Sequence, residues 1–401
     1  MRVAVIGAGV VGALTAYYLH RQGLDVSVYE RAGEAAALTS SANGGQLSYS
    51  FCDALADPQL LSKLPSILAG RDPAFVVKGI LQPQFVRWGL RFLRECNLAR
   101  RDVNTLALLD LCKRSAQLME PLLDRFGAEA DYSAGGKLVL LDTPVSAELE
   151  RRLQIKRDHG VRLEVLSRND VLNLEPTLNR WAWQPQAAIY APEDEVADAR
   201  AFTASLTRCL EQLGVSFSFN TAVTRLESNS DNGCQLYTAE GTHEYDACVL
   251  ATGHQANELL RSIGVRLPIV SMTGYSLTFA TGEHSPTRSM TALSRRTVFS
   301  PLGNRLRVAG LADFGAPRSA QEARIETLRE LARSLAPHAA DYEHPSVAPW
   351  CGDRAMTPDS QPIVRQLPNT RVFTNVGHGM LGWTLAAVTG ERVARLVSQV
   401  A

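Results

Sequence analysis

Apolar and polar residues alternate with two different periods along the chain, and these periods predict a mixed α/β fold. A buried strand from Val3 to Ile6 leads into a helical stretch closed by Gly23, and a second strand ends at Glu30. A later apolar run in "YDACVLATG" reads as a buried strand that ends at Thr252. Strand, helix and strand in direct succession predict a βαβ unit, the building block of parallel sheets.

The middle of the chain is first helical and then rich in strands. Helical periodicity marks "FVRWGLRFL" and "NTLALLDLCKRSAQLMEPLLDRFG", whereas "GGKLVLLD" and "VRLEVLS" read as strands. From about Val265 to Leu311 the alternation is that of an antiparallel sheet, and the helical pattern "SAQEARIETLRELARSLAP" follows it. The sequence therefore predicts a second region dominated by an antiparallel sheet.

Composition and charge narrow the class of protein. The 401 residues are 45% hydrophobic and 20% charged, which is typical of a soluble globular protein, and the length favours two domains. Because 41 basic residues balance 41 acidic ones, net charge gives no argument for nucleic acid or an anionic membrane. Seven scattered cysteines without a CxxC pair indicate free thiols in a reducing compartment and no metal site. No apolar run is long enough for a transmembrane helix and no signal cleavage site is recognisable, so we expect a cytoplasmic protein.

The segment "GAGVVG" after the first strand carries the strongest chemical signal. Gly7, Gly9 and Gly12 follow the G-x-G-x-x-G pattern of dinucleotide-binding units, where they serve a tight turn, backbone approach to a pyrophosphate and close helix packing. Glu30 ends the second strand, where an acid holds ribose hydroxyls and disfavours a 2′-phosphate. The pattern alone leaves the identity of the dinucleotide open, and a purely structural βαβ unit is the alternative.

Five motifs, spread from one end of the chain to the other, carry a family resemblance. Together, "GAGVVG" with Glu30, "TSSANGGQ", "LATG", "GDRAMTPDSQPIV" and "GHGMLGWTLAAVTG" resemble the D-amino acid oxidase and dehydrogenase superfamily of FAD enzymes. The likeness is greatest to bacterial D-amino acid dehydrogenases, including members resembling D-hydroxyproline dehydrogenases, and "GYSLT" is a further shared motif. The chain departs from the family where Arg354-Ala355 replaces an Arg-Pro pair, so the charge is kept and the stiffening proline is lost.

The resemblance implies a two-domain α/β fold with a Rossmann-like FAD-binding domain built from separated segments. An antiparallel-sheet substrate domain is inserted between those segments. We expect residues 1–50, 197–266 and 345–401 to form the FAD-binding domain, and residues 51–196 and 267–344 to form the substrate domain.

The resemblance also implies which residues bind FAD. Glu30 is expected to hold the adenosine ribose, and Val223 to reach the adenine through its backbone unless it is only a core strand residue. The C-terminal glycine segment is expected to pass the flavin pyrimidine edge, with backbone N–H groups near O2, where negative charge gathers on reduction. The implied FAD-binding residues are Gly7, Gly9, Val10, Val11, Gly12, Glu30, Arg31, Ser40, Ser41, Asn43, Gly45, Gln46, Val223, Thr252, Gly253, Gly377, His378, Gly379, Met380, Leu381, Gly382 and Thr384.

His378 has two readings within this segment. By residue type it is a candidate catalytic base, but its position among glycines favours a packing or flavin-contact role. No histidine or cysteine stands in a recognised attachment motif, so we expect the FAD to be bound non-covalently.

Substrate recognition requires a group that clamps an α-carboxylate. Arginine suits this task because its planar fork offers two parallel hydrogen bonds, and Arg354 stands where the family places its carboxylate-binding arginine. Tyr275 is a candidate second contact through its hydroxyl, or else a buried aromatic of the sheet. Arg307 reads more readily as a strand residue than as a ligand, and the acidic triplet at 193–195 as a solvated loop.

The resemblance implies FAD-dependent dehydrogenation of a D-amino acid to the imino acid by hydride transfer to flavin N5, as in amino acid catabolism. A cyclic amine such as D-proline or a hydroxyproline is the alternative substrate within this chemistry. A nicotinamide-dependent dehydrogenase and a non-enzymatic flavoprotein subunit are the alternatives from other classes. The implied electron acceptor is a quinone, an electron-transfer chain or oxygen, and a quinone allows peripheral association with the inner membrane.

Overall fold

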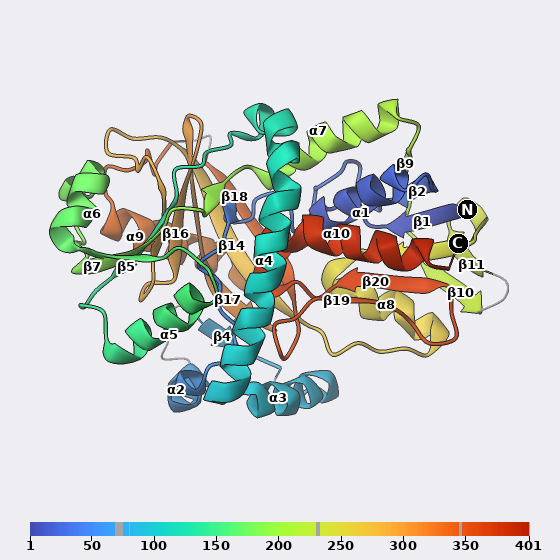
Figure 1. Cartoon of the computed structure of the whole chain (residues 1–401), viewed down its shortest axis with the longest axis horizontal. Helices are drawn as coiled ribbons and strands as arrows, with labels where there is room; N and C mark the ends of the chain where they lie inside the picture. The colour runs from blue at the N-terminus through green and yellow to red at the C-terminus, as the bar shows by residue number, and fades with distance from the viewer. Residues whose placement is uncertain (69–74, 80, 230–232, 345–346, 401) are drawn as a thin grey trace.

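The computed structural model describes residues 1–68, 75–79, 81–229, 233–344 and 347–400. Figure 1 shows two large sheets, one at each end of the long axis, with α4 (Leu98–Phe126) running across the molecule between them. Among the residues described, no helix combines the length and the apolar character needed to cross a membrane. The mixed α/β fold class expected from the sequence is confirmed.

The first sheet is the predicted nucleotide-binding type. Its strands, in spatial order, are β19 (Ile363–Gln366), β20 (Val372–Val376), β13 (Ala247–Leu250), β1 (Arg2–Ile6), β2 (Asp25–Tyr29) and β9 (Ser216–Ser218). All neighbouring pairs are parallel except β19 with β20. Residues 247–250 and 3–6 are buried on both faces, because helices pack on one face of these central strands and residues of 226–260 pack on the other.

The order in which the chain adds strands to this sheet reverses at β1. From β1 it passes through α1 (Val10–Arg21) to β2 on one side, while β13 and β20 lie on the other side of β1. In open α/β sheets, ligands bind outside the carboxyl ends of the strands at such a switch point. Gly7 and Ala251 directly follow β1 and β13, so the fold places the GAGVVG turn at this point.

The second sheet is mixed and contains the predicted antiparallel region. Its strands, in spatial order, are β18 (Ala348–Met356), β14 (Val270–Ala280), β17 (Arg305–Phe314), β16 (Thr297–Leu302), β15 (Ser289–Ala292), β5 (Lys137–Leu141), β7 (Ala187–Ala191) and β6 (Glu164–Ser167), with β4 (Phe75–Val77) paired to β17. Residues 348–356, which the expected domain division assigned to the FAD-binding segments, pair as β18 with β14 of this sheet.

Two small sheets complete the strands. They are formed by β10 (Arg225–Asn229), β11 (Gly233–Thr238) and β12 (Gly241–Tyr245), and by β3 (Gln46–Leu47) with β8 (Glu195–Val196). The β3–β8 pair joins the loop after "TSSANGG" to the segment that leads into α7.

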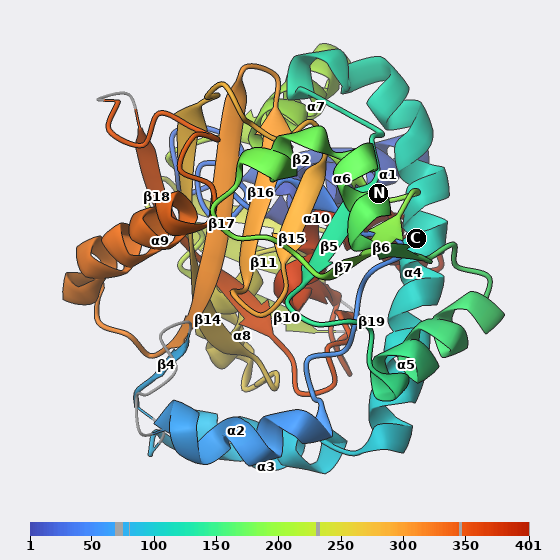
Figure 2. The ribbon, with the colours of Figure 1, turned by 90° about the vertical axis from the view of Figure 1, so that its left-hand side faces the viewer.

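The remaining helices cover both sheets. They are α2 (Pro58–Leu68), α3 (Pro83–Glu95), α5 (Ala147–Asp158), α6 (Arg168–Leu174), α7 (Ala199–Gln212), α8 (Ala256–Leu260), α9 (Gln321–Leu335) and α10 (Gly382–Ser398). One apolar core unites α1, α4, α7 and α10 with the first sheet, and another lies between the second sheet and α9. Figure 2 shows α9 against the second sheet, and α2 and α3 together at the opposite end of the view from α7.

Candidate active site

A cavity of about 1280 Å³ is lined by residues from both large sheets. It is larger than the roughly 300–1,000 Å³ of pockets for drug-sized ligands, as a site for a dinucleotide together with a substrate requires. The residues predicted to bind FAD or substrate all line it, except Gly12 and Ser41. The family motifs, which lie far apart in the sequence, therefore meet around one space.

The GAGVVG turn forms one end of this cavity. Gly7 has φ = 101°, which side chains rarely adopt, and a Cβ on it would lie 2.8 Å from the carbonyl oxygen of Ala251. A Cβ on Gly12 would overlap the Gly7 carbonyl, so Gly12 lets α1 start close to β1. The Glu30 carboxylate accepts the N–H groups of Ala8 at 2.8 Å and Ala32 at 2.9 Å. A carboxylate has further lone pairs, so Glu30 keeps acceptor capacity for ribose hydroxyls.

The loop "TSSANGGQ" is fixed by contacts to the second sheet. Backbone carbonyl oxygens of Ala42 and Gly44 accept hydrogen bonds from Ser276 and Ser300, each at 2.6 Å. At its start, the Ser40 hydroxyl accepts the Val10 N–H of the first turn of α1 at 3.1 Å. The loop is thereby held along the cavity between the helix N-terminus and the sheet, where the resemblance places the path from pyrophosphate to flavin.

Two buried polar atoms on the cavity wall have no hydrogen-bond partner among the residues that the structure describes. They are the Thr252 hydroxyl, which follows β13, and the indole N–H of Trp383 in the first turn of α10. Buried polar groups are normally hydrogen-bonded, and an exception calls for a ligand, a bound water or a functional role. Val223 lies in the irregular segment before β10, not in a strand, and it too lines the cavity. These observations fit a large polar ligand such as FAD.

The C-terminal glycine segment follows β20 and also lines the cavity. Gly377 and Gly379 have φ values of 83° and 56°, so the turn before α10 needs glycine. Gly382 is different, because its backbone is helical and a Cβ there would meet only His378, at an ordinary 3.7 Å. No neighbour within the described chain explains this glycine, whereas a ligand lying against the helix start does.

His378 points its ring at α10. The side chain is 7% exposed, and its Nε2 lies 3.0 Å from the Thr389 hydroxyl. Burial lowers the pKa of His378 to about 4, so the ring is neutral near neutral pH. This arrangement favours the packing role over that of a catalytic base.

A cysteine lining the cavity is relevant to whether the flavin is covalently attached. Cys351 lines the cavity next to Gly352, but its side chain packs against the core of the second sheet. We therefore predict that acid precipitation releases all of the yellow cofactor into the supernatant, measured by its absorbance. Yellow colour that stays with the precipitated protein would show a covalent bond, and Cys351→Ser would then identify or exclude this cysteine.

Arg354 is the cation best placed to meet a substrate carboxylate. It lies on β18 opposite Met272 of β14, and its guanidinium crosses the backbone of Gly274, whose missing Cβ leaves the space that it fills. No carboxylate pairs with it among the described residues, and loss of water around the group lowers its pKa. An arginine remains charged under these conditions, so the site presents an unpaired cation to an anionic ligand.

The other two predicted contacts have partners within the protein. The Tyr275 hydroxyl donates to Asp313 at 2.8 Å and the side chain is 1% exposed, so we leave it out of the proposed clamp. Arg307 forms an ion pair with Asp198 at 3.0 Å and donates to the backbone oxygen of Asn43 at 3.4 Å. Arg307 thus lies on β17, which confirms the preferred reading as a strand residue, and it anchors the "TSSANGGQ" loop.

Apolar side chains that were not predicted from the sequence line the same cavity as Arg354. Trp350 lies on the same face of β18 as Arg354, with its indole over Gly352. In a strand, alternate residues lie on one face, so the sequence already indicated that Trp350, Gly352 and Arg354 share a face. Further apolar lining residues are Leu55, Leu60, Phe75, Met272, Leu293 and Leu311.

The acidic triplet at 193–195 is not the solvated loop expected from its charge. Asp194 is fully buried and forms an ion pair with Lys137 at 3.0 Å, and it accepts the Ser50 N–H at 2.6 Å. Lys137 also donates to the Ser48 hydroxyl at 2.7 Å. This buried pair holds the chain that follows the flavin loop, and it forms only when strands distant in sequence pair.

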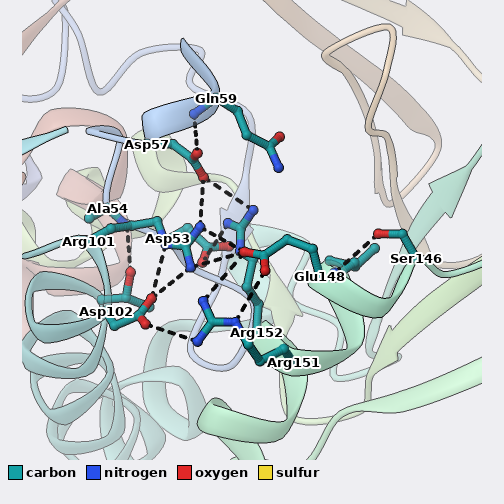
Figure 3. A network of polar contacts seen from close by, with 12 residues as sticks. Asp53, Ala54, Asp57, Gln59, Arg101, Asp102, Ser146, Glu148, Arg151 and Arg152 are labelled. Atoms are coloured by element: carbon teal, nitrogen blue, oxygen red, sulfur yellow. Dashed lines mark hydrogen bonds and ion pairs between the residues drawn. The ribbon is translucent and has the colours of Figure 1, made fainter. Parts of the chain in front are cut away.

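A larger ionic cluster fixes the next part of the cavity wall. Figure 3 shows Arg101 of α4, which is 1% exposed, and Arg152 of α5 converging on Asp57 at 3.4 and 3.3 Å. Arg152 also contacts Asp53 at 3.1 Å, and with Lys156 it holds the pKa of that carboxyl below its ordinary value although burial alone would raise it. Asp53 and Asp57 line the cavity, so the cluster ties this segment to two helices.

Comparison with known proteins agrees with this geometry. The family described as "DAO: FAD dependent oxidoreductase" matches residues 2–396. The chain is 35% identical to a D-amino acid dehydrogenase of Paramagnetospirillum magneticum, covering 99% of this chain and 95% of the relative. It is 34% identical to a D-amino acid dehydrogenase of Dechloromonas aromatica, covering 99% and 97%.

Solved structures with the same fold are more distant in sequence. A glycine oxidase from Geobacillus kaustophilus superimposes with a TM-score of 0.75 at 24% identity, covering 99% of this chain and 95% of that one. An L-proline dehydrogenase from P. horikoshii superimposes with a TM-score of 0.72 at 17% identity, covering 99% and 93%. At these identities the likeness shows a shared fold.

Proposed function

Because the chain belongs to the DAO family of FAD-dependent oxidoreductases, we propose that it dehydrogenates a free D-amino acid to the corresponding imino acid. The observation that carries this proposal is Arg354, an unpaired guanidinium in the cavity that also contains the dinucleotide turn. A carboxylate is the group that best complements this cation, because the two form parallel charge-assisted hydrogen bonds. The relatives named D-amino acid dehydrogenase support the choice of enantiomer.

The residues of the chain have three tasks in this reaction. Arg354 fixes the α-carboxylate and thereby orients the α-carbon, which is where proximity contributes most. The apolar wall around Trp350 and Met272 excludes water and favours the neutral amine that oxidation requires. Residues 379–382 line the cavity at the start of α10, where the positive end of the helix dipole stabilises negative charge. FAD, when bound, accepts the hydride from the α-carbon.

The alternatives from other classes have less support. A nicotinamide-dependent dehydrogenase does not fit the family, which is defined by FAD. A scaffold without activity has no use for an uncompensated arginine in a cavity, because burying such a charge lowers stability unless a ligand pairs with it. A cyclic D-amino acid remains within the proposed chemistry, since it carries the same carboxylate.

The proposal also covers the electron acceptor and the cellular role. We propose that the protein works in the cytoplasm in amino acid catabolism, and that the reduced flavin passes its electrons to a quinone or an electron-transfer chain, with oxygen as the alternative. A quinone acceptor implies contact with the inner membrane at its surface.

Product analysis tests this function. Purified holoprotein with a D-amino acid and a water-soluble quinone analogue is expected to release the oxo acid and ammonia, measured by chromatography. No product is expected without the quinone analogue under nitrogen, and added nicotinamide dinucleotides should not replace it. Product formation that depends on a nicotinamide dinucleotide would contradict the proposal.

A further inference from the structure

The α2–α3 end of the molecule concentrates exposed apolar side chains. Twelve large apolar side chains are exposed among the described residues, and five lie in this short stretch of the chain. They are Leu61 at 41%, Leu81 at 86%, Val86 at 41%, Leu90 at 58% and Leu93 at 45%. Both views place α2 and α3 at one end of the molecule (Figures 1 and 2). Such a concentration on a monomer surface marks an interaction site.

Basic charge accompanies these side chains. In a chain with no net charge, residues 58–94 contain six basic residues and one acidic residue. On α3, Phe85, Trp88 and Phe92 pack against the core, and the outward side carries an aliphatic stripe beside a basic one. The aliphatic stripe is Val86, Leu90 and Leu93, and the basic stripe is Arg87, Arg91 and Arg94. We call these six residues, together with Leu61 and Leu81, the docking face.

A cleft of about 630 Å³ adjoins the basic stripe. Five arginines line it, and two acids, Glu95 and Asp359, lie among them. Arg100 is paired with Glu95 at 3.3 Å, whereas the other four have no carboxylate partner among the described residues. The arginines are Arg91, Arg94, Arg100, Arg365 and Arg392. Unpaired guanidinium groups around one cleft suit a phosphate group, which they bind with two parallel hydrogen bonds.

We propose that the docking face binds the surface of an anionic phospholipid bilayer, with headgroup phosphates in the arginine cleft. Exposed leucines next to arginines are the arrangement in which apolar side chains enter the acyl boundary while the charges stay at the headgroups. A soluble acidic protein would match the charge, but its acidic side chains would not account for Leu81, which is 86% exposed at the turn before α3.

The position of the docking face connects it with the cavity. Gln59 and Leu60 of α2 and Phe75 of β4 line the large cavity, so the outer side of the same wall faces the proposed membrane. A lipid-dissolved electron acceptor would thereby meet the protein close to its active site. Binding itself does not rest on the proposed reaction, since vesicle association and flavin reduction are measured separately and either can fail alone.

Flotation with vesicles of phosphatidylcholine, with or without phosphatidylglycerol, tests the proposal on the full-length holoprotein. Binding is expected only with phosphatidylglycerol, and it should weaken as salt is raised. Arg91→Gln with Arg94→Gln should lower the affinity by roughly twentyfold, because each basic side chain contributes about fivefold at an anionic surface. Leu90→Gln with Leu93→Gln should also weaken binding, and both pairs should keep the parent's FAD content and melting temperature.

The matched control pair is Arg168→Gln on α6 with Leu213→Gln after α7, two exposed positions away from the docking face. It should float like the parent, and inorganic phosphate at the lipid concentration should not displace any variant. Equal binding of the Arg91/Arg94 pair and the parent would overturn the proposal. Absence of binding to pure lipid, with binding to vesicles that carry extracted membrane proteins, would assign the face to a protein partner and overturn it as well.

Discussion

Replacing Arg354 by alanine is expected to lower the catalytic efficiency with D-amino acids by roughly a hundredfold. Removing one partner of a desolvated charge pair typically costs about 2–5 kcal/mol, and about 3 kcal/mol corresponds to that factor. The guanidinium has no carboxylate partner in the part of the chain that the structure describes, so its removal breaks no ion pair there. FAD content and melting temperature should therefore stay close to those of the parent, and steady-state kinetics measures the effect.

Two further variants separate the geometry of the clamp from its charge. Arg354→Lys should recover only part of the loss, because an ammonium group cannot reproduce the planar fork. Gly274→Ala keeps the arginine but places a Cβ in the space of its guanidinium, so it should lose much of the same efficiency. Amino acid amides, which lack the carboxylate, should be poor substrates for the parent and lose little more in Arg354→Ala.

One outcome would show that Arg354 does not bind the substrate carboxylate. If Arg354→Ala is reduced by D-amino acids as readily as the parent, the carboxylate binds elsewhere. Arg307 would not replace it, since its guanidinium is occupied by Asp198.

Replacing Gly9 by valine is expected to abolish FAD retention. Gly9 has φ = −67°, which any residue adopts, and a Cβ there would meet only the Ser40 hydroxyl at 3.2 Å. The protein itself therefore tolerates a side chain at this position better than at Gly7 or Gly12, where a Cβ would collide with backbone. A pyrophosphate bound against the start of α1 would not tolerate a side chain at Gly9, because it must contact the backbone there.

The flavin absorbance of the purified variant, relative to its protein absorbance, measures the effect. Gly89→Val is the matched control, since Gly89 lies on α3 and a Cβ added there would meet no described neighbour within 4 Å, so this variant should keep its flavin. Circular dichroism should show that Gly9→Val is folded. A folded Gly9→Val with normal flavin content would contradict the assignment of this turn to the dinucleotide.

Local patterns made the first βαβ unit predictable. Its strands and its helix follow from the pattern of residues close in sequence, and φ = 101° at Gly7 bears out the tight turn. The resemblance brought distant motifs together, since apolar periodicity cannot show that Gly377 and Gly7 line one cavity.

Contacts between residues far apart in sequence determine the partners of the buried polar side chains, which the sequence alone did not show. Asp194 looked solvated because acids usually are, and only Lys137 on a paired strand makes its burial favourable. Similarly, the hydroxyl of Tyr275 was a candidate ligand until the pairing of β14 with β17 placed Asp313 beside it, and the partner of Arg307 is Asp198, the N-cap residue of α7. Residue type predicted the chemistry of these groups but not their partners.

An anaerobic titration of the holoprotein with matched D- and L-amino acids is the sharpest test of whether the bound flavin oxidises D-amino acids. We expect one equivalent of a suitable D-amino acid to bleach one equivalent of flavin, and a quinone analogue to restore the yellow colour of the bleached protein. The L-enantiomer should leave the yellow colour unchanged. A flavin that stays oxidised with every D-amino acid tried, cyclic ones included, or that is bleached equally by both enantiomers, would contradict this expectation.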